Sequence, residues 1–223
     1  MSEIADGVRA ASLAVAALML IVNPLGSAPI FLSMTADLPT AARRLLPHRV
    51  AWNSFLLLSA AMLAGSHVLH FFGISVPIVR VGGGLLVIAN GWRLLDAADV
   101  PPVEKLGPAV AWEREVARRA FYPLTFPLTV GPGSLSIAVT IGAALSAQPT
   151  VGVFGVVSDL IGVAIVALSV SLSYRFAARV IAFVGETGAT VFLRLCSFIL
   201  LYVGVNIMWS GLADLIRPMI SRG

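Results

Sequence analysis

The stretch IVNPLGSAPIFLSMT, residues 21–35, interrupts a hydrophobic segment that otherwise suits a membrane-spanning helix. It places an asparagine, two prolines and a glycine between residues 23 and 29. Proline removes a backbone donor and clashes with the preceding helical turn, whereas glycine permits backbone angles that other residues resist. The apolar run before it, residues 10–22, would give about 20 Å of helix, and the hydrocarbon core is about 30 Å thick. We therefore expect a helix that is broken within the membrane.

A second break of the same kind is expected in FPLTVGPGSLSIAV, residues 126–139. Freed backbone groups cannot face lipid, so both breaks should face protein or a wet cavity. The helix start after each break would suit a carboxylate, and the unwound carbonyls would suit an ammonium group or a cation. Together they would bind a zwitterion. The candidate substrate-binding residues are Asn23, Pro24, Gly26, Ser27, Thr129, Gly131, Gly133 and Ser134.

The composition indicates an integral membrane protein. The 223 residues are 58% hydrophobic and 12% charged, whereas soluble domains carry about 25% charged residues. The net charge of +4 is attributed to cytoplasmic arginines, so no nucleic-acid partner is expected. A single cysteine excludes a disulfide framework, and we expect no metal cluster and no cofactor. The N-terminal MSEIADGVRA lacks the basic region of a signal peptide and is expected to lead into a retained helix.

Hydropathy predicts an all-α membrane protein with six transmembrane helices, each close to the required 20 or so residues. A polar, proline-rich cytoplasmic linker at 96–115 separates a first three-helix repeat, 1–95, from a second, 116–223. The first and fourth helices would be discontinuous. The predicted spans are 8–35, 50–72, 74–95, 116–147, 151–174 and 190–216.

Arginine and lysine predict the orientation. Ten of them fall in the connections after the first, third and fifth spans, and three fall on the opposite side. The positive-inside rule then places both termini in the periplasm.

Three spans per half means that similarity between the halves relates segments of opposite direction. NPLGSAPIFLSM corresponds to PLTVGPGSLSIAV, and Arg80 to Trp92 in the third span corresponds loosely to Arg194 to Trp209 in the sixth. Inverted repeats with matching interruptions are typical of secondary transporters, whose substrate site lies at the interruptions.

The ordered segments NPLGSAPIFLSMT, FFGISVPIVRVGGGLLVIANG, PLTFPLTVGPGSLS and FLRLCSFILLYVGVNIMWSGL resemble the MarC family, also called the neutral amino acid transporter family. The resemblance covers essentially the whole chain. It implies two inverted three-helix repeats and transport of small neutral amino acids such as glycine and alanine. Relatives often have Asp where this chain has Asn23, and Asn at Ser27. The first difference removes a possible cation ligand.

Asp159 is the one carboxylate well inside a predicted span, and we consider it and Asn53 as coupling candidates for H⁺ or Na⁺. Pairing of Asp159 with Arg80 or Arg194, or a wet position near the headgroups, is the alternative. The two arginines are expected to anchor helix ends. Residues 82–84, three glycines, are expected to serve close helix packing.

The sequence therefore favours a secondary transporter of small neutral amino acids in a bacterial inner membrane, with the lipid bilayer as its surroundings. An uncoupled exporter or channel is the main alternative. An intramembrane serine protease using Ser134 with His67 or His70 is the remote one, and we expect no enzyme activity. Oligomeric state, coupling ion and direction of transport stay open.

Overall fold

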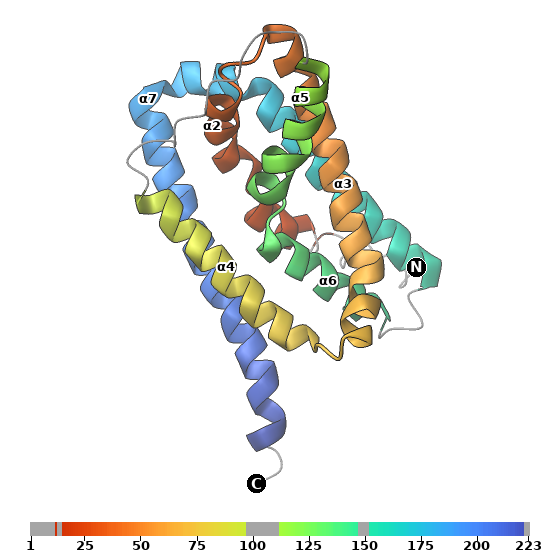
Figure 1. Ribbon diagram of the computed structural model, residues 1–223. Helices are drawn as coiled ribbons and strands as arrows, with labels where there is room; N and C mark the ends of the chain where they lie inside the picture. Colours follow the sequence, from red (N-terminus) through yellow and green to blue (C-terminus); the bar gives the residue numbers. More distant parts are fainter. Residues whose placement is uncertain (1–11, 13–14, 97–111, 147–151, 221–223) are drawn as a thin grey trace.

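The computed structural model describes residue 12 and residues 15–96, 112–146 and 152–220. Within these ranges the chain is helical and contains no strand, which confirms the all-α prediction. Most of the predicted linker lies outside the described residues. After a helical segment at 15–22, the elements are α2 (Pro24–Met34), α3 (Thr40–Phe71), α4 (Val76–Asp96), α5 (Trp112–Arg119), the irregular segment η1 (Ala120–Thr129), α6 (Pro132–Ser146) and α7 (Gly152–Ile220) (Figure 1). Within η1, Tyr122 and Phe126 have extended backbone angles.

The described surface carries many large apolar side chains, as a lipid-facing surface does. Phe154 and Phe198 are 82% and 67% exposed. By length and composition, three described helices suit a membrane crossing, or up to four if a pair bent by 74° forms one span. The three are Val15–Leu32, Val153–Arg179 and Ser197–Arg217, and the bent pair is Arg114–Thr129 with Pro132–Ala143. The arrangement of six spans in two repeats therefore stays a prediction.

The helices extend beyond the predicted spans into the predicted connections after the first and fifth spans. Helix α3 begins at Thr40 rather than near residue 50, so the arginines after the first span lie on its first turns. The range of α7 comprises two helices joined at Gly185, whose backbone angles are non-helical (φ 75°, ψ 168°). This kink lies within the predicted connection between the fifth and sixth spans, and the first of the two helices continues past residue 174 as far as the kink. A helix satisfies its own backbone hydrogen bonds, so it need not end where the hydrocarbon ends.

Glycines bring neighbouring helices into close contact. A β-carbon placed on Gly84 of α4 would lie 2.6 Å from Met208 N and 2.7 Å from Gly204 O of α7. Gly83 faces Ser136 of α6 in the same way, whereas Gly82 faces open space. The predicted packing role of this glycine run therefore holds for two of its three members. Figure 1 shows α4 crossing the C-terminal part of α7.

Helices α3 and α6 also meet through small residues. A β-carbon on Gly142 would collide with the backbone carbonyl of Met62, and one on Gly65 would collide with the side chain of Val139. These contacts hold α6, which follows the second break, against the C-terminal third of α3.

Candidate functional site

The first break is a single residue, Asn23, whose φ of 43° lies in the left-handed region. Pro24 and Gly26 were predicted to be unwound, but both lie in the first turn of α2. Proline is favoured at this position because its missing N–H is unpaired there in any helix. Asn23 caps the new helix, since its Oδ1 accepts a hydrogen bond from Gly26 N–H at 3.2 Å. The side-chain oxygen is therefore already occupied, and the amide group remains as the donor.

The second break lies between η1 and α6. Val130 is extended (φ −113°, ψ 91°), Gly131 is non-helical, and α6 begins at Pro132 after a bend of 74°. Val130 N–H donates to Thr125 O at 2.7 Å, and the Ser134 hydroxyl donates to Gly131 O at 2.8 Å. The break predicted at this point is present, and part of its freed backbone is satisfied locally.

The hydroxyl of Tyr174, on α7, joins the two breaks. It donates to Ser27 Oγ at 3.0 Å and lies 2.7 Å from Thr129 Oγ1. Ser27 belongs to the first turn of α2, and Thr129 is the last residue of η1. The ring of Tyr174 also stacks on Phe31, with centroids 4.3 Å apart. Residues separated by about a hundred positions are thereby brought into one hydrogen-bonded cluster.

The hydroxyl chain formed by Ser27, Tyr174 and Thr129 is buried, and it has fewer hydroxyl protons than acceptor oxygens within hydrogen-bond distance. The three residues are 2–7% exposed. Ser27 Oγ donates to Asn23 O at 3.1 Å, and Thr129 Oγ1 approaches Leu124 O at 2.6 Å. Each hydroxyl has one proton, so Thr129 can donate to Leu124 or to Tyr174 but not to both. The cluster therefore has at least two alternative hydrogen-bond arrangements.

Tyr174 was missed as a site residue, because in the sequence it only marked the end of the fifth span. A signal was present. Asp159, Val163, Val166, Val170 and Tyr174 recur at helical spacing, and the structure buries all five. A buried tyrosine hydroxyl at the end of such a stripe requires a polar partner.

Gly133, a predicted substrate-binding residue, has a packing role. A β-carbon there would collide with the side chain of Val87 and lie 3.6 Å from Gly83 O. This glycine lets α4 approach the start of α6. Of the predicted substrate-binding residues, Ser27 and Thr129 are the pair that Tyr174 joins.

The coupling candidates lie away from the hydroxyl chain. Asp159 is 3% exposed and on the same helix face as Tyr174, but 15 residues of helix place it about 22 Å along the axis. Within the described chain its carboxylate has no hydrogen bond or ion pair. Arg80 instead pairs with Asp214 at 2.6 Å and donates to Thr140 Oγ1 at 3.3 Å. The pairing of Asp159 with Arg80 considered above is therefore wrong.

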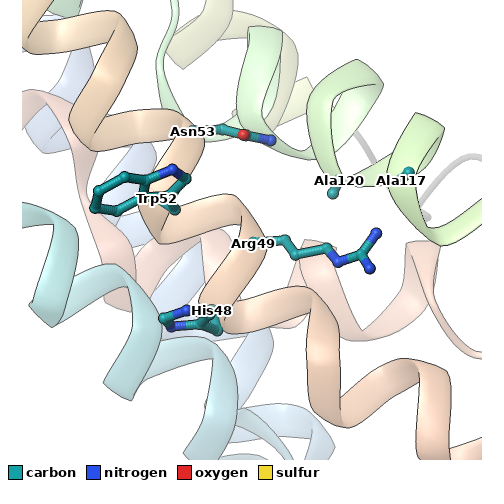
Figure 2. A pocket seen from close by; sticks show the side chains of 6 residues that line it. All are labelled: His48, Arg49, Trp52, Asn53, Ala117 and Ala120. Atoms are coloured by element: carbon teal, nitrogen blue, oxygen red, sulfur yellow. The ribbon is translucent and has the colours of Figure 1, made fainter.

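The residues proposed for a protease are not assembled in the described structure. The Ser134 hydroxyl bonds to Gly131 O, and His67 and His70 are exposed near the end of α3. Asn53, also on α3, is half-buried and faces a different hollow, toward α5 and η1 (Figure 2).

Arg119 connects the end of α2 to the start of η1, away from the two breaks. Its side chain is 7% exposed and forms two hydrogen bonds with Asp37, of 2.8 and 2.9 Å. It also donates to Glu115 at 2.7 Å and to Met34 O, at the end of α2, at 3.4 Å. The hydrogen bond from Arg119 lowers the pKa of Asp37 below its ordinary value. This ion cluster fixes the end of α2 against the start of η1.

Comparison with known proteins gives a family over nearly the whole chain. Residues 9–216 match the model of the MarC family integral membrane protein. The chain is 30% identical over 219 residues to the UPF0056 inner membrane protein MarC of Citrobacter koseri, covering 95% of this chain and 98% of that protein. It is 27% identical to the UPF0056 membrane protein YvbG of Bacillus subtilis, covering 89% and 92%. No solved structure matches. The chain therefore belongs to the MarC family of integral membrane proteins.

Proposed function

We propose that this protein is a secondary transporter of small neutral amino acids in a bacterial inner membrane, working by alternating access around its two helix breaks. The observation that carries the proposal is the Tyr174 hydroxyl, which bonds Ser27 at one break and lies within hydrogen-bond distance of Thr129 at the other. In transporters with inverted repeats, broken helices meet where the substrate binds.

Helix packing supports the six-span inverted repeat that this mechanism needs. A two-fold relation would exchange the first span (α2) with the fourth (α6), the second (α3) with the fifth (first part of α7), and the third (α4) with the sixth (last part of α7). The contact of α2 with α7 through Phe31 and Tyr174 would then correspond to the contact of α6 with α3 through Gly142 and Met62. The contact between α4 and the last part of α7 at Gly84 joins the third span to the sixth, so the two-fold relation leaves it unchanged. The arginine distribution supports periplasmic termini.

The chemistry of the breaks suits a small zwitterion. The start of α6 carries a partial positive charge, and Asn23 keeps its amide donor, so both favour a carboxylate. The hydroxyl and carbonyl oxygens of Ser27 and Thr129 can accept bonds from an ammonium group. Because both hydroxyls already bond to that of Tyr174, a substrate would replace internal bonds, and each break would then be free to rearrange.

Uptake of labelled glycine or alanine into proteoliposomes tests the proposal, with and without H⁺ or Na⁺ gradients. We expect saturable uptake that a cation gradient drives above equilibrium. Tyr174→Phe should reduce it at least tenfold, because the link between the breaks is lost. Tyr202→Phe, the same change at a residue 68% exposed, should not.

Thermal unfolding of both variants would show whether each is folded. Absence of saturable flux for any neutral amino acid would refute the transporter. Flux that equilibrates but never accumulates would favour the uncoupled channel instead.

A further inference from the structure

An open groove of about 210 Å³ lies on the flank of the molecule, between α3 and the α5–η1 segment. Figure 2 shows Arg49 and Asn53 extending from α3 toward the small side chains of the other wall. Its volume is below the 300–1,000 Å³ or so of a site that encloses a whole small molecule. The groove therefore suits part of a larger ligand. Its lining residues are His48, Arg49, Trp52, Asn53, Ala117 and Ala120.

Among the described side chains, the groove carries a positive charge without an ion-pair partner. Arg49 is exposed and forms no ion pair with any described residue. Of the acidic side chains described near the α5 wall, Glu115 and Asp37 are both held by Arg119. Arg114, one turn before the groove residue Ala117, is likewise exposed. An anionic group is the complementary ligand.

After Arg49 in the sequence, the same face of α3 is apolar. Leu45, Arg49, Trp52, Leu56 and Leu63 recur at helical spacing, and Trp52, Leu56 and Leu63 are 46–56% exposed. Tryptophan is enriched where hydrocarbon meets headgroups, so Trp52 marks the depth of that boundary. The ligand would thus meet charge at one end and an apolar stripe at the other.

We propose that this groove binds the headgroup of an anionic phospholipid such as phosphatidylglycerol. Arg49 would hold the phosphate, for which the planar guanidinium gives paired hydrogen bonds. Asn53 and the indole N–H of Trp52 would bond glycerol and ester oxygens, and the acyl chains would follow Leu56 and Leu63. The inference is independent of what the protein transports. Basic pockets between helices at the cytoplasmic side are a known mode of anionic lipid recognition.

Native mass spectrometry of the detergent-purified protein, with added phosphatidylglycerol or phosphatidylcholine, tests the site. We expect one phosphatidylglycerol to be retained in preference to phosphatidylcholine. Arg49→Gln should weaken retention about fivefold, the effect of one interfacial arginine. Arg44→Gln, the same change at an exposed position of α3 outside the groove, should change it less than twofold.

Ala117→Leu supplies a variant that keeps the charge but fills the groove, and it should also weaken retention. Excess inorganic phosphate should not displace the lipid, because a free phosphate lacks the acyl chains. Equal losses in Arg49→Gln and Arg44→Gln, equal retention of both lipids, full retention in Ala117→Leu or displacement by phosphate would each overturn the proposal.

Discussion

Replacement of Arg119 by glutamine tests whether one ion cluster holds the two broken helices in register. The guanidinium is 7% exposed, and it bonds Asp37 twice, Glu115 once and Met34 O at the end of α2. Removing one partner of a buried ion pair costs about 3–5 kcal/mol. Here Asp37 is 25% exposed, and Glu115 keeps its bond to Arg118, so we expect a loss of about 2–3 kcal/mol.

Thermal unfolding in detergent measures this loss, which should lower the Tm by about 4–12 °C for a chain of this size. The matched control is Arg118→Gln, whose side chain is 68% exposed and, among the described residues, pairs only with Glu115. It should cost about 0.5 kcal/mol or less. Combining Arg119→Gln with Asp37→Asn should cost less than the sum of the single changes. Equal destabilisation by the two arginine variants would refute the role assigned to Arg119.

The other predictions concern packing, pH and coupling. Gly84→Ala should destabilise the protein by about 1–3 kcal/mol through collision with Met208, whereas Gly82→Ala, facing open space, should be neutral or slightly stabilising; equal stabilities would exclude that contact. Because Arg119 holds the pKa of Asp37 below its ordinary value of 3.8, the stability advantage over Asp37→Asn should be complete above about pH 5 and lost as the pH falls further. An advantage unchanged down to pH 2 would contradict this. Asp159→Asn should reduce gradient-driven accumulation more than substrate binding, and unchanged accumulation would leave Asp159 a structural role.

The breaks could be predicted from the sequence because proline and glycine act locally. The same local rules could also have placed the first break at Asn23. Asparagine followed by proline is the cap and first residue of a helix, which is how Asn23 and Pro24 are arranged. The weight given to proline as a helix breaker hid its opposite role at a helix start.

Other features depend on contacts between distant segments and have no local pattern. Arg80 was predicted to anchor a helix end, but its partner Asp214 lies 134 positions away. The groove at Arg49 forms because Ala117 lies opposite it on another element. Spacing within one helix can show which residues share a face, but it cannot show which helix covers that face.

The hydroxyl chain gives a physical reason for the two breaks to change together. If Thr129 turns its proton from Leu124 to Tyr174, the end of η1 loses a backbone bond, and Tyr174 is left to donate to Ser27. If Tyr174 donates to Thr129 instead, Ser27 loses its donor at the start of α2. A buried unpaired group is unfavourable, so a ligand that satisfies one arrangement changes the free energy of the other. Two breaks without this bridge could bind a substrate, but they would have no shared bond through which binding at one could alter the other.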